Sequence, residues 1–115
     1  MAEPTTRPDG PQLSRGEFGL LILGLLQRRE MYGYEVVAQL RETSKHVIDL
    51  PEGTVYPALR RLEHDGLISG HWVDVSGGAP RRRYYALTLT GERALASGRA
   101  EWQRFKTAAD TVLGS

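Results

Sequence analysis

The segment Leu50–Ile68, LPEGTVYPALRRLEHDGLI, decides how the rest of the chain is interpreted. At helical spacing, Val55, Leu59 and Leu62 fall on one face, which predicts a helix that packs this face against a core. The other face combines hydroxyl groups, guanidinium groups and a proline ring. Its members are Thr54, Tyr56, Pro57, Arg60 and Arg61. A small protein that presents such groups on one helix is expected to use them for binding.

The patterns around this segment predict a winged helix-turn-helix. Apolar periodicity, β-branched runs and turn residues divide the chain after residue 13 into helices and one hairpin. The further expected elements are helices from Ser14 to about Leu26 and over Gly33–Thr43, strands over Ile68–Val75 and Arg82–Leu87, and a helix from the cap Thr88 to about Leu113. The fold is thus expected to be mainly α with a small β-hairpin. Residues 1–13 should form a flexible tail, residues 14–88 the winged domain and residues 89–113 a dimerisation helix.

The composition narrows the function classes. Fifteen Lys and Arg residues against 14 Asp and Glu residues give a formal charge of only +1, so only clustered charge could indicate a nucleic-acid partner. The chain has no cysteine, and its three histidines lack ligand spacing, so neither a metal nor another cofactor is expected. No nucleophile–base pair or phosphate-binding glycine loop indicates an enzyme. The apolar runs are too short to span a membrane and no signal peptide is visible, so the expected location is the cytoplasm.

The polar face of the opening helix fits the major groove of double-stranded DNA, which admits a helix and displays the base edges. Thr54 and Tyr56 can donate hydrogen bonds to phosphate oxygens near the start of the helix. Arg60 and Arg61 can bind guanine in a bidentate manner or pair with phosphates. Pro57 can contact a thymine methyl group, and its fixed φ suits an early helical position.

Three consecutive arginines at the end of a Gly-rich turn indicate a second DNA contact. Arg81, Arg82 and Arg83 stand at the expected tip of the hairpin, where such a concentration of positive charge has little structural purpose. Wings of this kind reach the minor groove or the flanking backbone, whose negative potential attracts arginine. Trp72, on the other strand, is expected to pack beneath the wing.

The last helix carries a heptad pattern. Its apolar or small positions alternate by three and four residues at Leu95, Gly98, Trp102, Phe105, Ala109 and Val112. The first helix is apolar almost all round, which requires cover on every side. The two helices are therefore expected to form a homodimer interface from Phe18, Ile22, Leu95, Trp102, Phe105, Ala109 and Val112. The alternative is that both helices only close the core of a single chain.

Three motifs, in order and at matching spacing, resemble the PadR family of bacterial transcriptional regulators. They are MYGYEVVAQL (Met31–Leu40), GTVYPALRRLEHDGLI (Gly53–Ile68) and RRRYYALTLTGERAL (Arg81–Leu95). The single C-terminal helix is similar to that of the small members. The resemblance implies a homodimeric DNA-binding regulator, usually a repressor on a pseudo-palindromic operator, and it adds Tyr32 to the residues expected to meet DNA.

The resemblance also implies that a small molecule controls DNA binding. In a dimer, Trp102 would face its symmetry mate, Gly98 would widen the gap between them, and Phe105 would lie one turn further along. Such a slot suits a flat aromatic effector. The alternative is that the indoles simply fill the dimer core. A winged helix that binds another protein instead of DNA is also left open, because total charge is near zero and the fold serves both uses.

Overall fold

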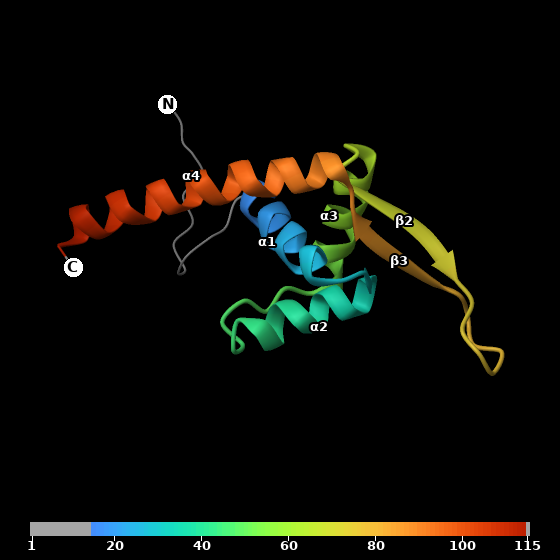
Figure 1. Ribbon diagram of the computed structural model, residues 1–115. Coiled ribbons are helices and arrows are strands. Elements are labelled where there is room, and N and C mark those ends of the chain that lie inside the picture. The colour runs from blue at the N-terminus through green and yellow to red at the C-terminus, as the bar shows by residue number, and fades with distance from the viewer. Residues whose placement is uncertain (1–14, 115) are drawn as a thin grey trace, which may run out of the picture.

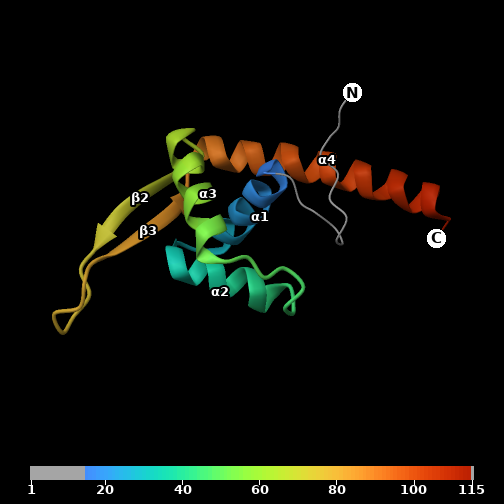
Figure 2. The ribbon, with the colours of Figure 1, turned by 180° about the vertical axis from the view of Figure 1, so that it is seen from behind.

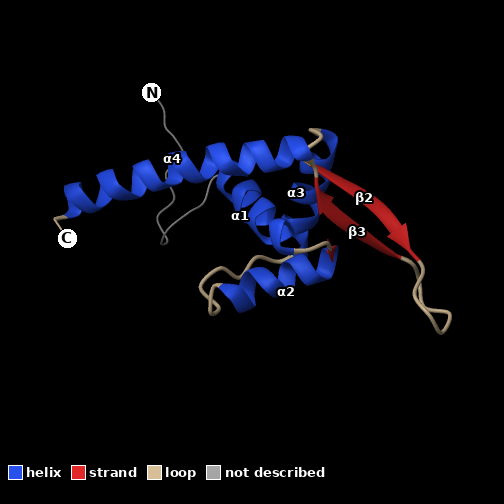
Figure 3. Ribbon diagram, viewed as in Figure 1, coloured by secondary structure: helices blue, strands red, loops and turns tan. Residues whose placement is uncertain are grey.

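The computed structural model describes residues 15–114, with side chains from residue 18 onward, so the expected tail lies outside the described residues. Figures 1 and 3 show a mainly helical chain with one small sheet. Its elements are α1 (Arg15–Arg28), β1 (Met31–Tyr32), α2 (Gly33–Thr43), α3 (Glu52–His64), β2 (Ile68–Val73), β3 (Arg82–Leu87) and α4 (Leu89–Leu113). This order confirms the predicted winged helix-turn-helix with a C-terminal helix.

The sheet has three antiparallel strands in the order β1-β3-β2, where the sequence predicted a two-stranded hairpin. The added strand, β1, pairs Met31 with Tyr85 and Tyr32 with Tyr84. A strand of two residues is too short to show a period of its own, so its partner in space is what identifies it. β1 joins the wing to the start of α2.

The chain itself covers most of α1, contrary to the expectation that a second copy must do so. In Figures 1 and 2, α1 lies between α4 on one side and α2 on the other, and it also contacts α3 and β3. Ile22 is only 1% exposed and Leu95, on α4, only 2%. Both side chains are buried in the core of one chain, so neither offers surface to a partner. Phe18 remains half-buried.

Gly98 lies where α4 packs against Leu20 of α1. A Cβ atom added at this position would stand 2.5 Å from the Leu20 Cδ1 atom, so any larger residue would force the Leu20 side chain to move. The space above Gly98 is therefore filled by the chain's own leucine. This corrects the interpretation that Gly98 widens a gap between two copies.

The second half of α4 extends away from the domain, on the side opposite to the wing (Figure 1). The helix starts at Thr88, whose hydroxyl oxygen accepts a hydrogen bond from the Gly91 N–H at 3.0 Å, as its predicted role as a cap requires. Beyond the part that packs on α1, apolar side chains face solvent: Phe105 is 64% exposed and Val112 83%. Trp102 stacks on Phe105 with 5.9 Å between ring centroids. Among residues 15–114, nothing apolar covers this surface.

Candidate nucleic-acid interface

The polar face of α3 is held outward because its opposite face is buried. Val55, Ala58, Leu59 and Leu62 point into the core. At 3.6 residues per turn, the side directly opposite presents a stripe of exposed residues to solvent. This stripe consists of Gly53, Pro57, Arg60 and His64. The sequence interpretation gave no role to His64, although its spacing from Arg60 places it on the same stripe.

Pro57 lies in the second turn of α3, later than the early position predicted for it. A proline nitrogen has no hydrogen, so the Gly53 carbonyl four residues earlier lacks its usual helical donor. Both residues are exposed, so water can take the place of that donor. Thr54 and Arg61 are half-buried and flank the stripe on the side of α3 away from the wing.

A cleft of about 420 Å³ lies between α3, the start of α2 and the wing. It brings together residues that are far apart in the sequence. The lining residues are Tyr32, Gly33, Tyr34, Tyr56, Arg60, Trp72, Arg81, Arg82, Arg83 and Tyr85. Of the residues predicted to meet DNA, Tyr32, Tyr56, Arg60, Arg81, Arg82 and Arg83 line the cleft, whereas Thr54, Pro57 and Arg61 lie outside it. Tyr34 and Trp72 are members that the prediction did not include.

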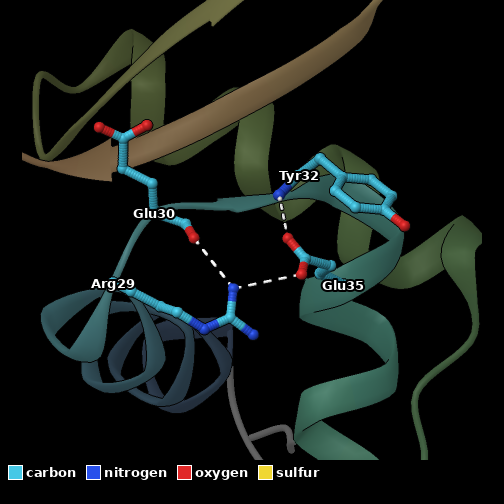
Figure 4. Close-up of polar contacts among 4 residues, drawn as sticks. All are labelled: Arg29, Glu30, Tyr32 and Glu35. Atoms are coloured by element: carbon cyan, nitrogen blue, oxygen red, sulfur yellow. Dashed lines mark hydrogen bonds and ion pairs between the residues drawn. The ribbon is translucent and has the colours of Figure 1, made fainter. Parts of the chain in front are cut away.

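Glu35 positions Tyr32 at the rim of the cleft (Figure 4). Its carboxylate accepts a hydrogen bond from the Tyr32 backbone N–H at 3.1 Å, which satisfies one of the unpaired donors at the start of α2. Arg29 donates to the same carboxylate at 3.2 Å and to the Glu30 carbonyl at 3.2 Å. The Tyr32 ring points away from this network (Figure 4), so these bonds hold the backbone and do not engage the phenol.

Tyr56 packs over the backbone of Gly33. A Cβ atom at Gly33 would lie 2.9 Å from the Tyr56 Cε1 atom, so the first residue of α2 must be small for the ring to fit. Burial, and to a smaller extent the Glu52 carboxylate, raise the pKa of the Tyr56 phenol above its usual value. A phenol is neutral at physiological pH even at its usual pKa, so Tyr56 is a hydrogen-bond donor there.

The wing arginines stack on aromatic rings. The Arg82 guanidinium lies 4.3 Å from the centroid of the Tyr32 ring, and the Arg81 guanidinium lies 5.0 Å from that of Trp72. Trp72 itself is 53% exposed, so the prediction that it packs beneath the wing is wrong. Its strand partner at this register is Arg83, and the indole lies between the guanidinium groups of Arg81 and Arg83 at the surface of the wing.

Arg83 differs from its two neighbours. Its guanidinium donates to the Glu63 carboxylate of α3 at 2.6 Å, and both side chains are 30% exposed. Within the part of the chain that the structure describes, Arg60, Arg81 and Arg82 make no ion pair. The lining of the cleft includes no acidic residue. The cleft is therefore a positively charged, aromatic surface that suits a negatively charged partner.

Other kinds of site find no support in residues 15–114. Acidic and histidine side chains do not gather in a group that could hold a metal ion. None of the described helices combines the length and the apolar character needed to cross a bilayer.

Comparison with known proteins gives consistent matches. The model of the transcriptional regulator PadR-like family matches residues 22–97. A PadR family transcription regulator from Clostridium difficile is similar in structure, with a TM-score of 0.73, 35% identity and coverage of 83% of this chain and 96% of that one. Bacillus subtilis PadR in complex with operator DNA has a TM-score of 0.64 and 26% identity, over 70% of this chain and 45% of that one.

The Bacillus subtilis protein is also described as a negative transcriptional regulator. It is 28% identical over 74 residues, which is 64% of this chain and 40% of that protein. The match thus covers less than half of the length of that protein.

Gly33→Ala is expected to lower the free energy of unfolding by about 1–3 kcal/mol, because the new methyl group collides with the Tyr56 ring. Gly53→Ala is the matched control: no atom of the described residues lies within 4 Å of its Cβ position. That change should raise stability by about 0.4–1 kcal/mol by restricting the unfolded chain. Urea denaturation of both variants measures the difference, and equal stability would contradict the packing described for Tyr56.

Proposed function

Because the chain belongs to the PadR-like family of transcriptional regulators, whose members are not enzymes, we propose that it represses transcription as a homodimer on a pseudo-palindromic operator. The observation that carries the proposal is the cleft, in which cationic and aromatic side chains from α3, α2 and the wing converge. A surface used to bind another protein would not need so many unpaired guanidinium groups. Repression follows the description of the Bacillus subtilis relative as a negative regulator. A regulator of bacterial DNA would act in the cytoplasm.

In this proposal, α3 enters the major groove with its exposed stripe facing the bases. Arg60 reads a base edge, and the Pro57 ring contacts a thymine methyl group. The Tyr56 phenol donates to a phosphate oxygen, and Tyr32 does the same from the start of α2. Thr54 and Arg61 contact the backbone from the other flank of α3. Arg81 and Arg82 reach the minor groove or its phosphates.

The dimer is proposed to form through the second half of α4. Trp102, Phe105 and Val112 expose apolar surface on a helix that extends away from its own domain, and Ala109 lies between them on the same seam. Phe18 of α1, which is half-buried in its own chain, is proposed to complete the interface. Ile22 and Leu95 no longer belong to the proposed interface because they are buried in one chain. Two winged domains joined in this way would present two copies of α3 to one operator.

The stacked pair Trp102 and Phe105 is also the proposed effector site. Its ring centroids are 5.9 Å apart and its planes are inclined by 30°, so the pair offers a partly exposed aromatic surface. In a dimer, two such pairs would face each other, and a flat aromatic molecule could stack between them. Gly98 takes no part in this site because Leu20 of the same chain fills the space above it.

DNA binding should weaken steeply with salt, and the wing should account for part of this dependence. The logarithm of the affinity falls by about 0.9 per logarithmic unit of salt for each phosphate neutralised. Replacing Arg81 and Arg82 with Ala should reduce this slope on any sequence, whereas Arg60→Ala should cost roughly 1–3 kcal/mol on the operator alone. Fluorescence anisotropy on a selected operator and on random DNA measures both effects.

Arg93→Ala, on the exposed surface of α4 outside the cleft, is the control for these variants. It should leave both the affinity and the slope unchanged. Equal losses for Arg60→Ala on operator and random DNA would show that Arg60 only positions the protein.

Sedimentation equilibrium at micromolar concentration should give twice the chain mass. Phe105→Asp should produce a folded monomer, because Phe105 is largely exposed in its own chain and an unpaired carboxylate in the interface costs several kcal/mol. Arg104→Asp places the same side chain one residue away, off the heptad seam, and should remain dimeric. A monomeric parent protein with a native circular dichroism spectrum would contradict the proposed assembly.

A panel of planar aromatic cations and phenolics tests the effector site. In a Trp72→Phe background, Trp102 is the only tryptophan, so its fluorescence reports binding directly. We expect saturable quenching by at least one compound, lost in Trp102→Ala while the dimer mass is retained. The absence of saturable quenching across the panel would mean that the two aromatic pairs close against each other.

A further inference from the structure

We propose that Arg83 is a positioning residue that ties the wing to α3, and that it makes no contact with DNA. The inference deepens the proposed function because it separates the three wing arginines into two that meet DNA and one that sets the angle of the wing. It also replaces the sequence-based expectation that Arg83 binds DNA together with Arg81 and Arg82.

The first observation is the bond to α3. The Arg83 guanidinium donates to the Glu63 carboxylate at 2.6 Å, a charge-assisted contact at the short end of the usual range. This pair joins the middle of the wing to the last turn of α3, twenty residues apart in the sequence. The positive charge of this guanidinium is already neutralised by a carboxylate, so replacing that carboxylate with a DNA phosphate would gain little electrostatic energy.

The second observation is the packing around the guanidinium. It lies 5.2 Å from the centroid of the Trp72 ring and 6.0 Å from that of Tyr85. Below it is Gly70, where an added Cβ atom would stand 2.8–2.9 Å from three guanidinium atoms. Gly70 pairs with Tyr85 and Trp72 pairs with Arg83 across the two strands, so all four residues lie on the face of the wing that is turned to α3. The site is built around the arginine.

The third observation is the short turn between α3 and β2. The Gly66 N–H donates to the Glu63 carbonyl and the Leu67 N–H to the Leu62 carbonyl, both at 3.0 Å, with Gly66 at a φ of +79°. This arrangement closes the helix with a left-handed glycine, and β2 begins at the next residue but one. The wing is thus joined to α3 at its base by this turn and further out by the bond between Arg83 and Glu63. Pairing of β3 with β1 also holds the base of the wing, and the bond between Arg83 and Glu63 adds a direct attachment to α3 nearer the tip.

The consequence concerns residues that do meet DNA. The guanidinium groups of Arg83 and Arg81 lie 5.2 Å and 5.0 Å from the centroid of the Trp72 ring. The bond between Arg83 and Glu63 therefore also helps to position Arg81 through Trp72. Glu63 lies one helical turn from Arg60 on α3. The pair therefore sets the distance between a groove-reading arginine on α3 and a phosphate-binding arginine on the wing. Loss of the bond between Arg83 and Glu63 should therefore weaken binding to the operator more than binding to random DNA, because operator binding requires the α3 and wing contacts at the same time.

The experiment uses Arg83→Ala, Glu63→Ala and the double variant that carries both changes. Arg81→Ala serves as the comparison, and the native fold of each variant is checked by circular dichroism. Removing a carboxylate from a DNA-binding surface ordinarily strengthens DNA binding. If the pair acts as a unit, Glu63→Ala should instead weaken operator binding at least tenfold, as Arg83→Ala does, and the double variant should lose no more than either single one. The salt slope should drop by about one per chain in Arg81→Ala and stay unchanged in Arg83→Ala.

A second measurement needs no DNA. In a Trp102→Phe background, acrylamide quenching of Trp72 fluorescence should increase in both Arg83→Ala and Glu63→Ala, because the indole loses its stacked neighbour or that neighbour loses its anchor. Unchanged quenching, a lower salt slope in Arg83→Ala, or tighter operator binding by Glu63→Ala would each overturn the proposal. A parent protein that binds no DNA would instead overturn the proposed function, and the quenching result would still decide whether the tie exists.

Discussion

Burial of the apolar face of α3 is the constraint on which the rest of the structure depends. Val55, Leu59 and Leu62 reach the core shared with α1 and α2, which leaves the helix only one orientation. That orientation turns Pro57 and Arg60 to solvent. It also brings the side of α3 that carries Glu63 to the wing, where the Arg83 side chain meets it. The recognition surface is thus a consequence of hydrophobic packing, and its polar residues need to contribute little to stability.

The elements were accessible from the sequence because each has a strong local signal. The spacing of Val36, Val37 and Leu40 predicts α2, and Thr88 marks the start of α4 with a residue that caps helices well. The set of residues predicted to meet DNA was accessible for the same reason. A helix buried on one face exposes the other, which explains why Tyr56 and Arg60 of α3 reach the cleft, whereas Tyr32 and the wing arginines join them only through the folding of distant segments.

What the sequence could not show are relations between distant segments. β1 exists only because Met31 and Tyr32 find Tyr85 and Tyr84 on a strand fifty residues later. Gly98 has the spacing of a heptad position, yet its small size serves the approach of Leu20, which no local pattern announces. The three arginines of the wing look equivalent in sequence. Only the position of Glu63 and the gap left by Gly70 distinguish Arg83 from the other two.

The two halves of α4 differ in burial: the first half packs into the domain and the second half is exposed. Its first turns are embedded, with Leu95 in the core and Gly91 too close to the Leu67 carbonyl to accept any side chain. Its last turns are largely exposed within the part of the chain that the structure describes, with Val112 83% and Leu113 80% exposed. Substitutions there carry little penalty for folding, so this end of the helix is free to diversify while the DNA-reading domain is held constant by its packing. Within a lineage of such proteins, a new assembly partner or a new chemical signal could be acquired at this end without first restabilising the fold.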